Sequence, residues 1–213
     1  MLALFFNKAG KTNINAMKKL IACLALAFAG TAAWAQDTPA PNNYNVSIGP
    51  SIGFGHAFQT PYHSEFFPSW NAGITAIYGP VEWWGLGVDV RYSVEGAKTM
   101  VEGTERTMRL SYIRIPVKFI GFFGDYTDAF RPKVGLGPSF GFLMDQEDTY
   151  NVKANPFDVG VQGLLGFNYR LYRATWLNVD LNYYQGLTDV RQHTGTTELN
   201  GNLFLNAGVA FGL

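Results

Sequence analysis

Thiol and imidazole groups are scarce in this sequence. It has one cysteine, Cys23, and three histidines, His56, His63 and His193, among 213 residues. Cys23 lies in an apolar N-terminal stretch that we expect to be removed. The mature chain would then have no thiol for a disulfide, a zinc–thiolate site or a nucleophile. The histidines show no metal-ligand spacing, so we expect neither a metal site nor a cofactor.

An excess of charge of either sign is also missing. The sequence has 16 basic and 16 acidic residues and a formal net charge of zero. Four of the lysines, Lys8, Lys11, Lys18 and Lys19, precede the expected cleavage site. The mature chain therefore carries 16 − 4 = 12 basic residues against 16 acidic ones, a net charge of −4. Such a chain lacks the basic surface that binds phosphate backbones, so nucleic acid is not an expected partner.

No apolar run is long enough for a membrane-spanning helix. The run from Leu20 to Ala29 falls well short of the roughly 20 residues that a span requires. Met17-Lys18-Lys19 precedes it and Ala33-Trp34-Ala35 follows it, which is the layout of a secretory signal peptide. We predict an N-terminal extension and cleaved signal peptide over residues 1–35, a periplasmic lead-in over 36–43 and one barrel domain over 44–213. Met17 is the more natural start, although Met1 stays open.

Aromatic residues and glycine are abundant, at 15% of the chain and 24 residues. This composition favours many short strands and turns. Apolar and polar residues alternate with a period of two in eight segments: 45–54, 70–78, 84–95, 113–119, 133–142, 157–169, 177–183 and 202–213. Eight such runs are typical of a transmembrane barrel. The predicted fold is all-β, an eight-stranded antiparallel up-and-down transmembrane β-barrel.

Charge and glycine share one face of these segments, and this asymmetry decides which face meets lipid. The apolar face carries no charge. The opposite face carries most strand glycines and eight charged residues: Asp89, Arg91, Glu95, Arg114, Lys118, Lys133, Asp158 and Asp180. A soluble barrel has no reason to place glycine on its solvent face, because glycine weakens strands. A narrow lumen has little room beside long ionic side chains. We therefore expect lipid outside and a lumen of paired acids and bases with a structural role.

Aromatic residues cluster at the short connections, as in the girdles of membrane barrels. The clusters are Tyr78, Trp83 and Trp84; Phe122, Phe123, Tyr126 and Phe130; and Tyr169, Tyr172 and Trp176. The connections 79–82 and 170–174 are short and 121–129 is of moderate length, and they alternate with the longer polar stretches 56–66, 96–108, 144–156 and 188–201. Short turns face the periplasm and long loops the exterior in such barrels. Both termini are then periplasmic.

Three prolines interrupt the expected strands. Pro50, Pro116 and Pro138 each remove a ladder donor that lipid cannot replace. We expect bulges or positions near the rims to accommodate them.

Several stretches resemble the PorT-like outer-membrane β-barrel family, which is related in architecture to the transmembrane domain of OmpA. The most specific is Tyr112-Ile113-Arg114-Ile115-Pro116-Val117. Others are Val134-Gly135-Leu136-Gly137-Pro138-Ser139, Asp158-Val159-Gly160 with Leu165-Gly166, and Tyr184-Gln185-Gly186-Leu187-Thr188-Asp189. The resemblance implies a Gram-negative outer-membrane barrel in which strand prolines are normal. It supplies no catalytic residues.

The residues therefore favour a non-enzymatic barrel with a structural or surface-interaction role. The loop stretches Thr104–Arg106, Asp145–Asp148 and Gln192–Gly195 are candidates for binding an extracellular ligand. Outer-membrane lipid and lipopolysaccharide are expected partners, and we expect a monomer. One alternative is a small gated pore whose ion pairs exchange partners. The least favoured is a lipid A-modifying enzyme using His63-Ser64-Glu65 with His56 and His193, because adjacent residues rarely form a triad.

Overall fold

The computed structural model describes residues 45–60, 66–101, 104–148, 153–191 and 197–213. The predictions for the signal peptide and for the lead-in concern residues 1–43, which lie outside the described residues. In the described part of the chain, no helix has the length and apolar character needed to cross a membrane.

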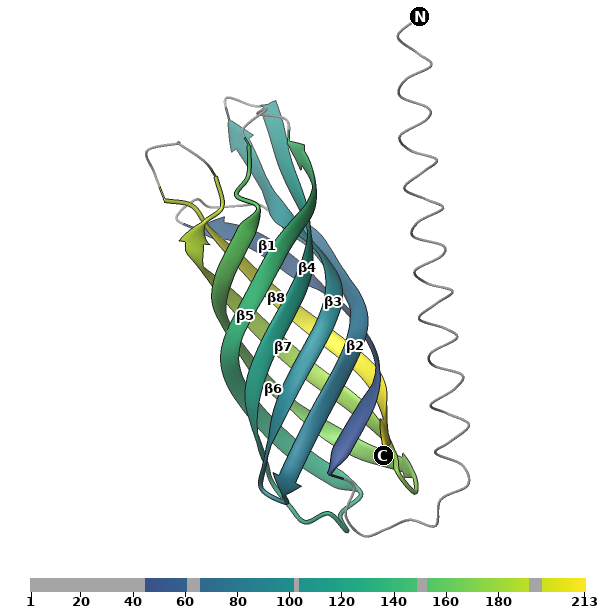
Figure 1. The fold of residues 1–213 in the computed structure, drawn as a ribbon. Helices are drawn as coiled ribbons and strands as arrows, with labels where there is room; N and C mark the ends of the chain where they lie inside the picture. The colour runs from purple at the N-terminus through teal and green to yellow at the C-terminus, as the bar shows by residue number, and fades with distance from the viewer. Residues whose placement is uncertain (1–44, 61–65, 102–103, 149–152, 192–196) are drawn as a thin grey trace, which may run out of the picture. The chain divides into compact units, whose positions relative to one another are not determined.

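Eight strands form one closed sheet (Figure 1). They are β1 (Val46–Thr60), β2 (Phe67–Val81), β3 (Trp84–Val101), β4 (Thr104–Phe122), β5 (Phe130–Asp148), β6 (Phe157–Tyr172), β7 (Thr175–Asp189) and β8 (Leu199–Gly212). Each strand pairs antiparallel with the next, and β8 pairs antiparallel with β1. The fold is therefore the predicted all-β, eight-stranded up-and-down barrel.

The two faces of the strands differ as the alternation predicts. Large apolar side chains stand outside, as Phe54 does at 64% exposure and Leu136 and Leu165 do at 62%. Polar side chains from the opposite face fill the lumen and are buried there. Because a belt of exposed apolar residues is stable only against lipid, the barrel exterior is a membrane surface.

Glycine makes room for the polar side chains inside. A Cβ added at Gly141 would lie 2.8 Å from Nη1 of Arg114, and one at Gly53 would lie 2.5 Å from Nδ2 of Asn206. At Gly160 it would lie 2.5 Å from the Tyr184 ring. Crowding in a narrow lumen therefore explains Gly53 and Gly141 and contributes at Gly160, whereas at Gly49, Gly55 and Gly137 an added Cβ would first meet backbone atoms of a neighbouring strand.

Each strand proline lies where pairing with one neighbouring strand is interrupted while pairing with the other neighbour continues. Pro50 pairs with Ile74 of β2, whereas the β1–β8 ladder skips from Ile48 to Ser51. Pro116 pairs with Ser139 of β5 and lies in a gap of the β3–β4 ladder, which skips from Val117 to Arg114. Pro138 likewise pairs with β6 and lies in a gap of the β4–β5 ladder. The missing N–H donor of each proline thus coincides with a local interruption of the strand pairing. The register is the same on both sides of each interruption, so there is no bulge.

The predicted loop over residues 96–108 is wrong. The β3–β4 ladder continues through Gly96↔Arg109 to Val101↔Thr104, and β5 extends to Asp148. Thr104–Arg106 and Asp145–Asp148 are consequently strand residues, and in Figure 1 β3, β4 and β5 reach beyond the other strands at the end opposite the C-terminus. The alternation of apolar and polar residues is expected only where a strand contacts lipid, whereas backbone pairing between strands continues beyond it. The sequence pattern therefore underestimates the length of the strands.

A charge at the middle of the apolar belt should be costly. We expect Leu136→Arg to destabilise the barrel in lipid by about 2–4 kcal/mol, because it places a cation near the bilayer midplane. Leu171→Arg is the matched control, since Leu171 is 52% exposed but adjoins a short turn. It should cost about 0–1 kcal/mol. Urea titration of barrels refolded in vesicles, read by heat-modifiable gel migration, measures both; equal costs would contradict this lipid placement.

Candidate functional site

An arginine cluster occupies the lumen toward the long-hairpin end. Arg114 of β4 contacts both carboxylate oxygens of Glu95 at 2.5 Å and Oδ2 of Asp158 at 2.6 Å. Its guanidinium lies over the ring of Tyr184 at 3.9 Å and that of Tyr112 at 4.8 Å. All five side chains are almost completely buried. A bidentate pair with a second carboxylate and two rings holds the cation firmly.

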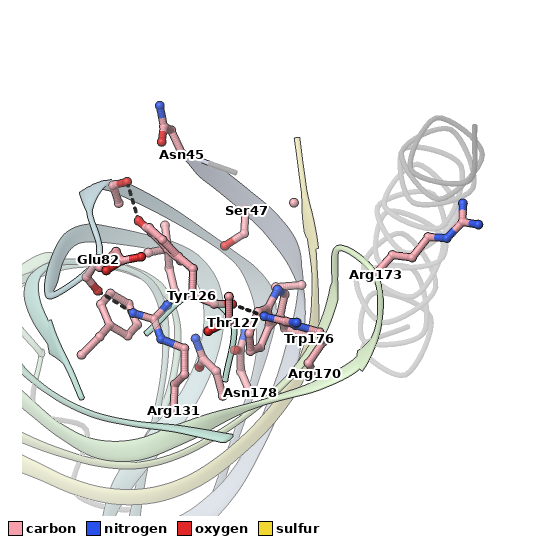
Figure 2. Close-up of a pocket in the computed structure, with 16 residues that line it drawn as sticks. Asn45, Ser47, Glu82, Tyr126, Thr127, Arg131, Arg170, Arg173, Trp176 and Asn178 are labelled. Carbon is pink, nitrogen blue, oxygen red and sulfur yellow. Dashed lines mark hydrogen bonds between the residues drawn. The ribbon is translucent and has the colours of Figure 1, made fainter. Parts of the chain in front are cut away.

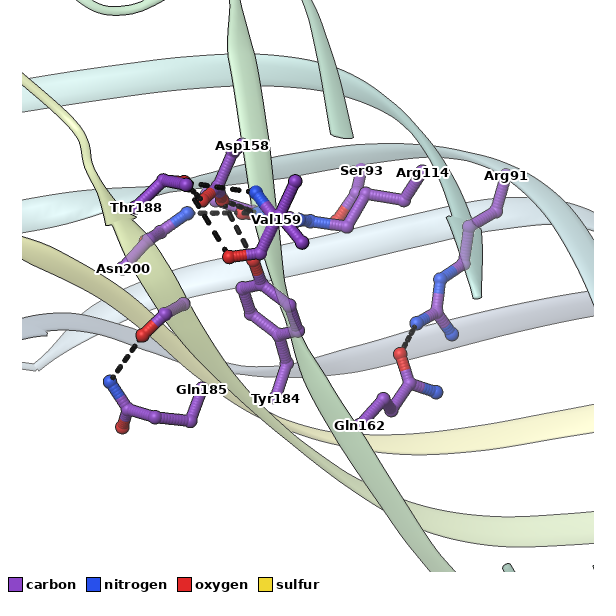
Figure 3. Close-up of polar contacts among 12 residues, drawn as sticks. Arg91, Ser93, Arg114, Asp158, Val159, Gln162, Tyr184, Gln185, Thr188 and Asn200 are labelled. Atoms are coloured by element: carbon purple, nitrogen blue, oxygen red, sulfur yellow. Dashed lines mark hydrogen bonds and ion pairs between the residues drawn. The ribbon is translucent and has the colours of Figure 1, made fainter. Parts of the chain in front are cut away.

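The two carboxylates of this cluster have further donors (Figure 3). Glu95 accepts hydrogen bonds from Ser93 at 2.8 Å and Asn200 at 2.5 Å. Asp158 accepts hydrogen bonds from the Tyr184 hydroxyl at 2.9 Å and Thr188 at 2.8 Å. With Arg114 included, the contacts join β3, β4, β6, β7 and β8 across the lumen. The carboxylate oxygens are satisfied by protein groups, as buried charges require.

A second cluster lies at mid-lumen around Asp89. Its Oδ2 contacts Nζ of Lys118 at 2.7 Å and Nη1 of Arg91 at 3.7 Å. Arg91 also donates a hydrogen bond to Gln162. Lys133 and Asp180 form a separate pair at 3.0 Å. The structure thus brings all eight predicted lumen residues into ion pairs, but in three groups.

A row of side-chain amides continues from Gln162 across the lumen. Gln162 donates to Asn182 at 2.8 Å, Asn182 to Asn206 at 3.3 Å, and Asn206 to Asn71 at 2.7 Å. Beside these groups, a cavity of only about 10 Å³ remains among Asp89, Lys118 and their neighbours. That volume holds about one water molecule, so little free space remains beside Asp89 and Lys118.

Sequence reasoning missed the uncharged members of these clusters. Tyr112 lies two residues from Arg114, and Tyr184 lies two and four residues from Asn182 and Asp180. Both tyrosines therefore lie on the inward face of their strands, as the side-chain amides of the lumen do. Strand parity could have found them, since side chains at i and i+2 share a face.

The lumen widens at the short-turn end into a cavity of about 350 Å³ (Figure 2). The connection 123–129 lies at this mouth, where Gly124 adopts a positive φ of 86°. The Tyr126 hydroxyl donates to the Gly79 carbonyl at 3.2 Å, and Arg170 donates to the Tyr126 carbonyl. Burial raises the pKa of the Tyr126 phenol above its ordinary value, so the phenol stays protonated and able to donate at neutral pH.

Three of the predicted girdle aromatics line this cavity instead: Phe122, Tyr126 and Trp176. The guanidinium of Arg131 lies over Phe122 at 4.9 Å and over Tyr126 at 4.8 Å, and that of Arg170 lies over Trp176 at 4.7 Å. Buried arginines attract these rings inward. Tyr78, Trp83, Phe123, Phe130, Tyr169 and Tyr172 are exposed on the outside, as a girdle requires.

The residues considered for lipid A chemistry do not form a visible site. His63, Ser64, Glu65 and His193 lie outside the described residues, as does the candidate loop Gln192–Gly195. His56 is in β1, where its Nδ1 accepts a hydrogen bond from the Phe67 amide at 3.2 Å and its ring stacks on Phe66 at 5.0 Å. Among the described residues, no group of three or more His, Cys, Asp or Glu side chains could hold a metal ion.

The geometry defines an outer-membrane barrel, and comparison with known families agrees. The family model described as "Outer membrane protein beta-barrel domain" matches residues 34–192, so the chain belongs to that family and to the outer membrane. No curated protein matches the chain.

Two solved structures share the fold. Neisserial surface protein A (NspA) is similar with a TM-score of 0.55 at 15% identity, over 79% of this chain and 97% of that one. The outer membrane protein OprG from Pseudomonas aeruginosa is similar with a TM-score of 0.55 at 13% identity, over 79% of this chain and 95% of that one. Identities this low establish the fold alone.

Removing the central cation should destabilise the barrel strongly. Arg114→Met leaves Glu95 and Asp158 buried without their cation, so we expect a loss of about 3–5 kcal/mol. Arg109→Met is the control, because Arg109 pairs with Glu147 at 3.8 Å on an exposed surface; it should cost at most about 1 kcal/mol. Urea unfolding in vesicles measures both losses.

A triple variant separates the effect of the unpaired charges from the effect of the changed side-chain shape. Adding Glu95→Gln and Asp158→Asn to Arg114→Met removes both orphaned charges and should recover part of the stability. Equal losses of unfolding free energy for Arg114→Met and Arg109→Met would show that the buried cluster contributes no more stability than an exposed ion pair.

Proposed function

We propose that this protein is a non-enzymatic structural barrel whose lumen is closed by its own side chains. The observation that carries the proposal is the crowded mid-lumen, where ion pairs and amides leave about 10 Å³ free. A hydrated ion needs a continuous water path, and a space for about one water molecule does not provide it. The eight lumen charges, Asp89, Arg91, Glu95, Arg114, Lys118, Lys133, Asp158 and Asp180, serve as this structural plug.

In the proposed orientation the short turns and both termini face the periplasm, and the extended β3, β4 and β5 face the exterior. Turn lengths support this orientation, because barrels of this class have short periplasmic turns and long extracellular connections. Outer-membrane lipid and lipopolysaccharide would surround the belt, and the barrel would act as a monomer. The resemblance of Tyr112–Val117 to the PorT-like fourth strand supports a narrower membership within the family.

A gated pore is the main alternative, and one contact favours it. Arg91 reaches Asp89 only at 3.7 Å and is otherwise hydrogen-bonded to neutral Gln162. A cation so weakly paired could change partners more readily than Arg114. A catalytic role has less support, since the family comparison supplies no catalytic residues and His56 is engaged by backbone and ring contacts.

Surface interaction is the second part of the proposal, and the length of the β3–β4 hairpin favours it. Its ladder continues from Val94↔Ser111 to Val101↔Thr104, whereas the β2–β3 ladder ends at Trp70↔Val94. The hairpin therefore projects past its neighbour and bears exposed groups such as Met100 and Arg109. A stiff projecting hairpin on a rigid barrel is a common platform for recognition.

Conductance tests the plug. In planar bilayers we expect the wild-type barrel to show no stable conductance. Removing the mid-lumen pair in the double variant Asp89→Ala, Lys118→Ala should create a conducting path, since it deletes two side chains beside the residual cavity. The control is Arg109→Ala, Glu147→Ala, which deletes an exposed pair and should stay closed. Steady wild-type conductance, unchanged in the mid-lumen variant, would instead support a pore.

Shortening the hairpin tests surface interaction. Replacing residues 97–108 by a two-residue Asn-Gly turn should preserve heat-modifiable migration, because Gly96↔Arg109 and the β3–β4 pairs below it remain. Cells expressing the shortened protein should lose adherence to host cells or matrix that wild-type expression confers. The control replaces Lys98 and Arg109 by alanine at full length, to separate loss of charge from loss of the hairpin. Unchanged adherence with the shortened hairpin would reject this part of the proposal.

A further inference from the structure

The cavity at the short-turn end is lined by more positive than negative side chains (Figure 2). Arg131, Arg170 and Arg173 line it, and Glu82 is the single acidic residue among the described residues that do so. Asp128, on the nearby connection, accepts a hydrogen bond from the Asp125 amide at 2.9 Å. The cavity therefore has an excess of positive charge.

The arginines here are held differently from those at mid-lumen. Arg131 donates to the Glu82 carbonyl at 2.5 Å, and Arg170 donates to the Tyr126 carbonyl. Both acceptors are neutral, and neither arginine forms an ion pair with a described residue. The carboxylates of Glu82 and Asp128 act favourably on the charge of Arg131, and the nearby Arg170 acts unfavourably on it. Neither carboxylate forms an ion pair with Arg131 or Arg170, so the two neighbouring guanidinium groups can still be joined by a further anion.

Unpartnered donors give the second observation. The Nε atoms of Arg131 and Arg170 are buried and have no hydrogen-bond partner in the described structure. Arg131 is only 5% exposed, so its Nε–H has little access to bulk water. Arg91 and Arg114 also have an unpartnered guanidinium nitrogen, but Arg131 and Arg170 line the cavity of about 350 Å³, where an acceptor has room to bind.

The surrounding groups fit an oxyanion. The guanidinium groups of Arg131 and Arg170 lie over the rings of Phe122, Tyr126 and Trp176, and they carry several N–H donors each. In-plane donors match the oxygen spacing of carboxylate and phosphate groups. Asn168 and Asn178 also have unpartnered side-chain oxygens at this cavity, but these are acceptors and do not contribute to oxyanion binding. A volume of about 350 Å³ is within the range of small-molecule sites.

We propose that this cavity binds an oxyanion, a phosphate or carboxylate group, through the guanidinium groups of Arg131 and Arg170. The group can belong to a soluble small molecule or to an anionic lipid headgroup. This site depends on the fold of the barrel and of the short-turn end, and not on the proposed closure of the lumen. The two proposals can therefore be tested independently.

The test observes the arginine ¹⁵Nε–¹H resonances of the barrel in a nonionic maltoside micelle. Ionic strength is kept near roughly 10 mM, where charges are weakly screened. One arm adds inorganic phosphate, a second adds acetate, and a third uses bicelles containing phosphatidylglycerol. Sodium chloride at matched ionic strength is the control for general screening. We expect saturable shifts of the Arg131 and Arg170 Nε–H signals.

The arms identify the source of the anion. Saturable shifts with phosphate or acetate indicate a soluble ligand, and shifts with phosphatidylglycerol alone indicate a lipid headgroup. No saturable shift in any arm, or equal shifts with chloride, would overturn the proposal. This titration uses only the wild-type protein, so it decides the question even if a variant fails to fold.

Variants then assign the site. Arg131→Gln and Arg170→Gln should each weaken the binding roughly tenfold or more, because each removes charge-assisted hydrogen bonds. Arg109→Gln is the matched control, since it removes the same charge from an exposed pair at the other end of the barrel. Heat-modifiable migration confirms folding for each variant. Equal affinity in folded Arg131→Gln, Arg170→Gln and Arg109→Gln proteins would refute the assignment.

Discussion

The structure depends on one constraint: lipid offers no hydrogen-bond partners to a peptide backbone. The sheet meets it by pairing β8 with β1, so that no edge remains. Closure with eight strands makes the lumen narrow and sends every second side chain into it. Because the space is limited, glycine alternates with long ionic groups, as Gly141 does beside Arg114. The polar core is thus a consequence of closing the sheet so that every backbone group can form its hydrogen bonds.

Ion pairs in such a core contribute specificity more clearly than they contribute stability. Buried pairs lose hydration free energy that apolar packing would not lose. Arg114, however, binds Glu95 on the neighbouring strand β3 and also Asp158 on β6, which is not adjacent to β4 in the sheet. A one-residue slip of β4 would turn Arg114 toward lipid and leave two carboxylates without their cation. The cluster therefore favours one register and one closure over the alternatives.

Much of this could be predicted from alternation, because lipid and lumen impose opposite polarity on successive residues. The eight strands, their faces and the eight lumen charges follow from it. The partners of each charge do not, since they depend on the stagger of strands around the barrel. The extension of β3 and β4 past residue 96 was also inaccessible, because strands in water need no alternation. The inward turn of Phe122, Tyr126 and Trp176 depends on how the connection 123–129 folds, which has no periodic signal.

The same residue type serves two different purposes along the lumen. Arg114 is paired with two carboxylates, whereas Arg131 and Arg170 donate to backbone carbonyls and form no ion pair with a described residue. The crowded mid-lumen lies beyond the mouth, where the free volume falls from about 350 Å³ to about 10 Å³. In the proposed closed barrel, the mouth is a blind pocket. A ligand would then enter and leave from the short-turn side, and the burial of the Arg131 side chain would strengthen its charge-assisted hydrogen bonds.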